Sequence, residues 1–117
     1  MARPGHLAEA RAAQWLQQQG VRVITRNWRA KTGEIDLIGI TQNILLFIEV
    51  RQRKSAHYGG AAASISYHKQ SRLMRTAQLY LQAHPQHQHR CCRFDAVLLH
   101  GSETKGRWEW IQNAFSE

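Results

Sequence analysis

Three segments with the pattern of β-strands follow one another along the chain, separated by very short turns. They cover residues 21–29, 34–40 and 44–53, and the turns between them are Lys31-Thr32-Gly33 and Gln42-Asn43. The first is rich in β-branched residues, the second alternates charged and aliphatic residues, and the third begins with an apolar run. Such short connections join antiparallel neighbours, because parallel neighbours need a longer crossover. The sequence therefore predicts a three-stranded antiparallel meander.

Two helices and further strands are expected around this meander. Apolar residues at three- and four-residue spacing predict a first helix over residues 4–19, which Gly20 ends. A Gly/Ala/Ser-rich loop over residues 55–63 leads to a second helix over residues 67–83, with Ser66 as its N-cap. The residues expected on the buried face of this helix are Leu73, Met74, Ala77, Tyr80 and Leu81.

Residues 93–100 predict a strong, central strand and residues 107–111 a weaker one, so that residues 101–117 form either a last strand or a tail. Three hairpin-linked strands followed by a helical crossover to a fourth imply an α/β fold, with a mixed central sheet flanked by helices. At 117 residues the chain is expected to be a single domain over residues 1–117, with its core at about residues 5–99.

The charge of the chain points to a polyanionic partner. Sixteen Lys and Arg against eight Asp and Glu give a net charge of +8, and twelve of the sixteen cations are Arg. Arg forms forked contacts with phosphate, so nucleic acid is the expected partner. The longest apolar run, Ile44–Ile48, is too short to cross a bilayer, and the N-terminal residues lack the apolar stretch of a secretory signal. We therefore expect no membrane association and a cytoplasmic location.

Two carboxylates interrupt strands that otherwise read as buried. Asp36 lies between Ile35 and Leu37, and Glu49 follows the apolar run of the next strand. Alternation places Glu34 and Asp36 on one face of their strand and Glu49, Arg51 and Arg53 on one face of the next. Two converging carboxylates repel unless a cation holds them, and oxygen ligands suit Mg²⁺ or Mn²⁺. The alternative is a structural ion pair of Asp36 with Arg51 or Arg53.

Four motifs carry a resemblance to a known family. They are Gly5-x3-Glu9-x2-Ala12-x3-Leu16-x3-Gly20, Arg26-Asn27-Trp28-Arg29, Gly33-Glu34-Ile35-Asp36-Leu37-Ile38 and Phe47-Ile48-Glu49-Val50-Arg51-x-Arg53, with Lys69 and Cys92-Arg93-Phe94-Asp95 further on. Together they resemble the YraN family of small bacterial proteins of undetermined role, which is placed with the PD-(D/E)XK nucleases and is similar to archaeal Holliday-junction resolvases. The resemblance implies a restriction-endonuclease-like αβββαβ core, which agrees with the element order predicted above.

The resemblance also implies roles for individual residues. Asp36 is similar to the central metal ligand and Glu49 to the second, with the carbonyl group of Val50 completing the inner shell. Glu9, which the helical spacing places beside an apolar face, would approach the same metal through water. The likeness to resolvases suggests a homodimer.

The chain departs from the superfamily pattern at Arg51, which stands where a lysine is usual. Arg stays protonated, so Arg51 can stabilise phosphate charge but cannot act as a general base. Lys69 on the second helix could supply a lysine instead, whereas Lys54 has the opposite strand parity to Glu49. Loss of the strand lysine leaves two interpretations open, a metal-dependent nuclease and an inactive nucleic-acid-binding module of the same fold.

Basic residues predict the binding surface around this centre. The candidates for phosphate contacts are Arg26, Arg29, Arg53, Lys54, Lys69, Arg72 and Arg75. No base-reading motif is evident, so recognition is expected through the backbone and shape of the nucleic acid. A third interpretation is a scaffold whose basic surface meets an acidic protein. Of the three interpretations, the paired carboxylates and the family resemblance favour a Mg²⁺- or Mn²⁺-dependent hydrolase acting on DNA, with structured or branched DNA as one expected form.

Overall fold

The computed structural model describes residues 6–53, 65–102 and 104–116. Its elements, in chain order, are α1 (His6–Gln18), β1 (Arg22–Ala30), β2 (Gly33–Thr41), β3 (Ile44–Arg53), α2 (Tyr67–Ala83), η2 (Pro85–His87), β4 (Cys91–His100) and β5 (Arg107–Phe115). The α/β class and the αβββαβ order predicted from the sequence are confirmed, and they match a restriction-endonuclease-like core extended by one strand. The predicted loop over residues 55–63 and the binding residue Lys54 lie outside the described residues.

The five strands form one mixed sheet in the order β1-β2-β3-β4-β5. The strands β1, β2 and β3 are antiparallel neighbours, as the short turns require, and β4 and β5 are also paired antiparallel. β3 and β4 run parallel, and α2 lies in the crossover between them. β4, predicted to be central, lies between β3 and β5, whereas β3 is the middle strand of the five.

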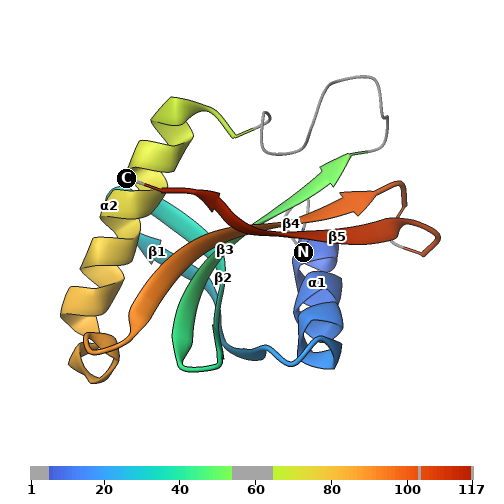
Figure 1. Cartoon of the computed structure of the whole chain (residues 1–117). Helices are drawn as coiled ribbons and strands as arrows, with labels where there is room; N and C mark the ends of the chain where they lie inside the picture. The colour runs from blue at the N-terminus through green and yellow to red at the C-terminus, as the bar shows by residue number, and fades with distance from the viewer. Residues whose placement is uncertain (1–5, 54–64, 103, 117) are drawn as a thin grey trace.

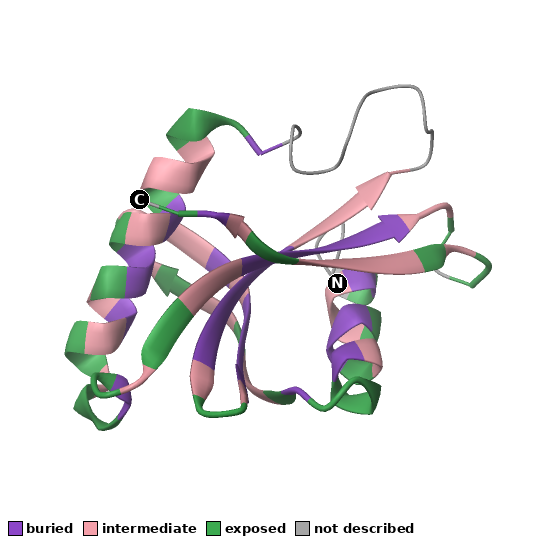
Figure 2. Cartoon of the chain, in the orientation of Figure 1, coloured by how far each residue is buried: buried purple, intermediate pink, exposed green. Residues whose placement is uncertain are grey.

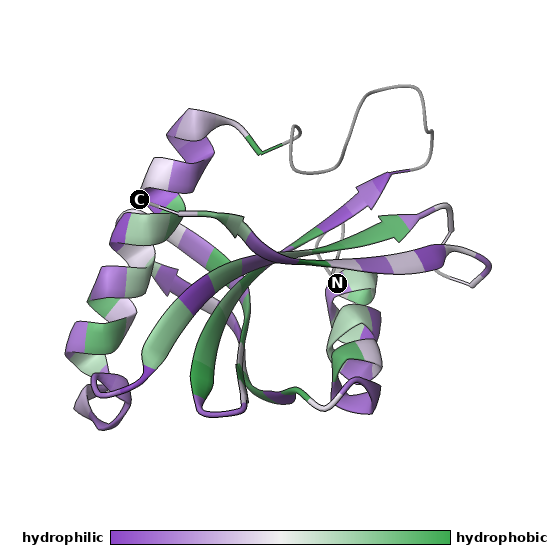
Figure 3. Ribbon diagram, viewed as in Figure 1, coloured by the Kyte–Doolittle hydropathy of each residue, from purple (hydrophilic) through white to green (hydrophobic). Residues whose placement is uncertain are grey.

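The two helices cover opposite faces of the sheet (Figure 1). The core under α2 includes Ile38, Phe47 and Tyr80, and the core under α1 includes Leu16 and Leu46. Strand alternation explains the division, since neighbouring residues of one strand face opposite sides. Buried and hydrophobic positions therefore follow the middle strands and one stripe of each helix (Figures 2 and 3). No helix in the described part of the chain has the length and apolarity needed to cross a membrane.

Local signals determine the bounds of α2. It spans the predicted residues 67–83, and the side chain of Ser66 accepts a hydrogen bond from the backbone N–H of Lys69 at 3.1 Å. Of its predicted buried face, Leu73, Ala77 and Tyr80 are buried, while Met74 and Leu81 are partly buried against the same core. The cap therefore fixes the first turn of α2, which carries Lys69.

The last strand is longer than the sequence indicates, because it extends to Phe115 instead of ending at residue 111. The pairing of β4 with β5 shifts register between Phe94 and Ala96. The fully buried carboxylate of Asp95 lies at this shift and accepts hydrogen bonds from Arg93, the Trp110 indole N–H and the backbone N–H of Asn113, each at 2.9 Å. Asp95 therefore holds β5 in place across the irregularity.

The tryptophans pack within the chain. Trp15 is half-buried, and its ring stacks on Trp108 with centroids 6.1 Å apart. Trp28 meets the ring of Tyr80 edge-on at 5.2 Å, and the indole N–H of Trp110 donates to Asp95. Each of the four tryptophans therefore has a ring contact or a hydrogen bond within the chain.

Candidate active site

The strands β2 and β3 separate before either of them ends. Their pairing stops at Leu37 and Ile48, whereas β2 continues along β1 as far as Gly33 and β3 continues along β4 as far as Arg53. Beyond the last pair, polar groups of both strands point into the space between them. The candidate site lies at this divergence.

Asp36 occupies the first position on β2 beyond the last pair. Its Oδ2 accepts a hydrogen bond of 2.9 Å from the backbone N–H of Val50 on β3, so a side chain takes the place of a carbonyl in the ladder. The cross-strand register places Glu49 opposite Asp36, because the last pair is Leu37 with Ile48. The two carboxylates therefore lie on the same face of the sheet.

The environment of Asp36 disfavours its ionised form. Burial is the largest cause, the negative charge of Glu49 adds to it, and together with the charge of Glu9 they raise the pKa of Asp36 from 3.8 to about 8. The hydrogen bond from Val50 acts in the opposite direction but does not compensate. A positive charge placed beside Asp36 would stabilise the ionised form of its carboxyl group.

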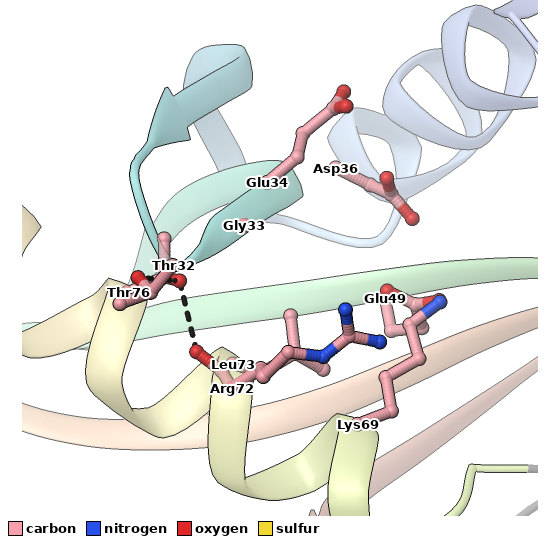
Figure 4. Close-up of a pocket in the computed structure, with 9 residues that line it drawn as sticks. All are labelled: Thr32, Gly33, Glu34, Asp36, Glu49, Lys69, Arg72, Leu73 and Thr76. Atoms are coloured by element: carbon pink, nitrogen blue, oxygen red, sulfur yellow. Dashed lines mark hydrogen bonds and ion pairs between the residues drawn. The ribbon is translucent and has the colours of Figure 1, made fainter.

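Glu49 is 4% exposed and is held by two cationic side chains. Its Oε1 lies 2.6 Å from the Nζ of Lys69 and 3.5 Å from the Nε of Arg51. Lys69 comes from the capped first turn of α2, so a helix beyond the strands supplies an ammonium group to the site. In Figure 4 the Lys69 ammonium group lies against Glu49, with Asp36 facing the same hollow.

Asp36 also belongs to a second group of carboxylates. The carboxylate oxygens of Glu9 from α1, Glu34 and Asp36 all lie within 4.8 Å of one another. The side-chain amide of Asn27 on β1 donates to Glu9 at 2.6 Å and to Glu34 at 2.8 Å. Glu9 thus faces inward, as its helical spacing predicts, and Asp36 belongs to both groups of carboxylates.

Two hollows meet at the divergence of the strands. One has a volume of about 190 Å³ and lies on the α2 side, where Thr32, Arg72 and Thr76 line it. The other has a volume of about 250 Å³ and lies on the α1 side, where Glu9 and Arg51 line it. Asp36, Glu49 and Lys69 line both hollows, so an extended ligand that crosses from one to the other passes over these three side chains.

The family of the chain follows from comparison with known proteins. A model of the uncharacterised protein family UPF0102 matches residues 8–99. The chain belongs to UPF0102. A UPF0102 protein of Alcanivorax borkumensis is 50% identical over 112 residues, covering 95% of this chain and 90% of the relative. A UPF0102 protein of Nitrosomonas europaea is 50% identical over 117 residues, covering 97% of this chain and 93% of the relative, and one of Pseudomonas putida is 46% identical over 114 residues, covering 97% and 93%.

These similarities confirm the family that the motifs predict under the name YraN. The matched region extends from α1 to β4 and contains all four carboxylates of the site, while β5 lies outside it. The names of the UPF0102 relatives state no activity. The chemistry of this UPF0102 member must therefore be argued from its own side chains.

The donor atoms of the site fit a hard divalent cation. Glu9, Glu34, Asp36 and Glu49 offer carboxylate oxygens only, which suits Mg²⁺ or Mn²⁺ and gives no nitrogen or sulfur ligand for a softer metal. Of the predicted ligands, Asp36 is shared by both groups of carboxylates. Val50 donates its N–H to Asp36, and its carbonyl faces the same side, since both groups of one strand residue point to the same neighbour.

Two residues of this arrangement were not predicted as site residues. Glu34 was placed on the same face as Asp36 by alternation, which is the signal that could have identified it. Asn27 was part of a recognised motif, but nothing in a strand pattern indicates that its amide turns toward Glu9 and Glu34. Its position depends on a left-handed backbone, with φ of 55°, in the middle of β1.

The predicted phosphate-binding residues lie at different distances from this centre. Lys69 contacts Glu49, Arg72 lines the α2-side hollow, and Arg75 is exposed on the same helix. Arg29 is exposed on β1, with its Nε 3.5 Å from Glu34, and Arg53 is half-buried at the end of β3. Arg26 instead lines a separate hollow between α1 and β1, so the structure does not bring it to the carboxylates.

Proposed function

We propose that this chain is a metal-dependent nuclease that hydrolyses phosphodiester bonds in DNA. The observation that carries the proposal is the divergence of β2 and β3, which leaves Asp36 and Glu49 facing one another beside the ammonium group of Lys69. Carboxylates for a cation, next to cationic groups for a phosphate, are what cleavage of a polyanion requires. The net charge of +8 supports a polyanionic substrate.

In this proposal the carboxylates hold one divalent cation, Mg²⁺ or Mn²⁺. Asp36 is the central ligand, joined by Glu49 and the carbonyl of Val50 from β3, by Glu34 from β2 and by Glu9 from α1. When bound, such a cation activates water and neutralises charge on the phosphate under attack. The raised pKa of Asp36 supports this assignment, because a bound cation would offset the burial and the repulsion that keep its carboxyl protonated.

The cationic side chains have separate roles. Lys69 can donate hydrogen bonds from a flexible ammonium group. It therefore supplies the lysine that is usual at the strand position of Arg51. Arg51 remains charged, which excludes it as a base but lets it bind a non-bridging phosphate oxygen. The side chains of Lys69 and Arg51 both contact Glu49, whose negative charge holds them beside the hollows.

The flanking cations would hold the rest of the substrate. Arg72 lines the α2-side hollow, Arg29 on β1 lies beside Glu34, and Arg75 is exposed three residues after Arg72 on α2. Contacts of this type bind phosphates without reading bases. Branched or otherwise structured DNA is the expected substrate form, since recognition would rest on the backbone and its shape.

A second candidate is a nucleic-acid-binding module without turnover. It is favoured by the contacts of Glu49, whose carboxylate oxygen faces both Lys69 and Arg51. Two cations on one carboxylate compete with a metal ion for the same oxygen. In this case the basic surface would still bind phosphates, and the carboxylates would only orient the cationic side chains.

Nicking of supercoiled plasmid, together with cleavage of branched, single-stranded and duplex DNA, tests the proposal. With Mg²⁺ or Mn²⁺ the wild-type protein should cut at least one substrate, and Asp36→Ala should lower the rate at least about 100-fold. Glu109→Gln is the control, because this carboxylate on β5 pairs with His100 outside the site. Cleavage that persists in chelator or in Asp36→Ala would refute the assignment.

The same assay separates the two candidates. A binding module binds DNA but leaves every substrate intact with either cation. Activity that appears only in Arg51→Lys would show that the lost strand lysine had inactivated the site. DNA binding with the salt dependence of only one or two phosphate contacts would contradict both candidates and favour the scaffold.

A further inference from the structure

Asn27 has a backbone conformation that its place in the fold does not require. It lies in the middle of β1, between the paired residues Arg26 and Trp28, yet its φ is 55°. Residues with a side chain rarely adopt this left-handed region, and Asn tolerates it better than most. Strain of this kind persists only where the surroundings impose it, and it concentrates at functional sites.

The side chain of Asn27 links two elements of the candidate site. A side-chain amide nitrogen carries two hydrogens, and those of Asn27 are directed at Glu9 on α1 and Glu34 on β2, at 2.6 and 2.8 Å. The two carboxylates are brought together by a neutral donor, although their charges repel. Both also lie within 4.8 Å of the oxygens of Asp36, the central carboxylate.

We infer that Asn27 is a positioning residue, which aligns Glu9 and Glu34 with Asp36 for a divalent cation. The inference rests on the proposed function, in which that cation serves phosphodiester hydrolysis. Hydrogen bonds to metal-binding carboxylates orient them, and their loss typically costs 10–100-fold in metal affinity. This role accounts for the left-handed backbone, because that conformation directs the side-chain amide of Asn27, on the edge strand β1, toward the carboxylate of Glu9 on α1.

Asn113 offers a matched control. It also has a left-handed backbone, with φ of 53°, but it is exposed on β5, where its backbone N–H bonds to Asp95. Substitution by glycine keeps the left-handed conformation accessible at either position and removes only the side chain. Asn27→Gly and Asn113→Gly therefore differ in whether the lost amide lies among the site carboxylates.

The experiment measures Mn²⁺ binding to the full chain by calorimetry and by electron paramagnetic resonance, with melting temperatures in chelator. We expect Asn27→Gly to raise the Kd for Mn²⁺ at least about tenfold, and Asn113→Gly to change it less than about twofold. The melting temperature of Asn27→Gly in chelator should stay close to that of Asn113→Gly. A residue with a purely structural role would instead change the melting temperature and leave the affinity for Mn²⁺ of the folded protein unaltered.

A second variant tests the electrostatic part of the inference. Asn27→Asp keeps the shape and tolerates the left-handed backbone, but it places a third carboxylate against Glu9 and Glu34. It should melt at a lower temperature than Asn27→Gly in chelator, and Mn²⁺ should raise its melting temperature more than that of the wild type. Equal melting of the two variants in chelator would contradict the inference.

The outcomes distinguish this inference from the proposed function. If the wild type binds Mn²⁺ and Asn27→Gly binds it equally well, the positioning role is wrong and the nuclease proposal stands. If the wild type binds no Mn²⁺, both are wrong. If Asn27→Gly binds Mn²⁺ more weakly than the wild type while Asn113→Gly binds it as the wild type does, the positioning role and the nuclease proposal are both supported.

Discussion

The free energy of unfolding should fall with rising pH because of Asp36. Its carboxyl has a pKa of about 8 in the folded chain, compared with 3.8 without the surroundings of the fold. A pKa that folding raises means that the folded state binds the proton more tightly, so the stabilisation is present at low pH and is lost as the pH rises through about 8.

The size of this effect follows from the same values. At about pH 6 the folded carboxyl is protonated while the unfolded one is ionised, and at about pH 9 both are ionised. The folded pKa lies about two units above the lower pH, and each unit corresponds to about 1.4 kcal/mol, so the wild type should lose about 3 kcal/mol over this range. Asp36→Asn, which does not titrate, should lack this loss.

Urea denaturation of both proteins in chelator, at intervals from about pH 6 to about pH 9, measures the difference. Added Mg²⁺ or Mn²⁺ should flatten the curve of the wild type, because a bound cation stabilises the ionised carboxylate, and should leave that of Asp36→Asn unchanged. Parallel pH dependence of wild type and Asp36→Asn in chelator would refute the reasoning, since Asp36 would then not be buried among like charges.

Two further predictions concern the phosphate-binding surface and the packing of the sheet. Replacing both Arg72 and Arg75 by Ala should reduce the slope of log affinity for duplex DNA against log salt by about two, because each lost phosphate contact removes about 0.9; an unchanged slope would place the DNA elsewhere. Asp95→Asn should cost about 3–5 kcal/mol of unfolding free energy, because it leaves Arg93 without the buried anion that both its Nε and Nη2 contact. Glu109→Gln, at a partly exposed ion pair, should cost about 1 kcal/mol or less, and equal losses in the two variants would contradict this account.

Elements with strong local signals are predictable from the sequence. The bounds of α2 follow from a serine cap and a following apolar stripe, and β3 follows from an apolar run that turns into alternation. β5 was predicted too short, because its extension depends on contacts with Asp95 made across the sheet. Local patterns carry information about capping and alternation but not about partners distant in the chain.

The candidate site divides in the same way. Alternation within each strand predicts which residues share a face with Asp36 and which share a face with Glu49, but only the pairing of Leu37 with Ile48 shows that the two carboxylates face the same side. The contact of Lys69 with Glu49 could be anticipated only as one option, since it depends on how α2 packs on the sheet. The metal-binding and catalytic roles of these residues stay predictions.

The amino-acid sequence determines the order of the elements, the basic character of the chain, and the residues that share a strand face with Asp36 or with Glu49. These properties depend on composition and on neighbours a few residues apart. The tertiary structure alone decides where β2 and β3 separate, which side chain of α2 neutralises Glu49, and how Asn27 joins α1 to β2. These features depend on side chains far apart in sequence that become neighbours only when the helices pack on opposite faces of the twisted sheet.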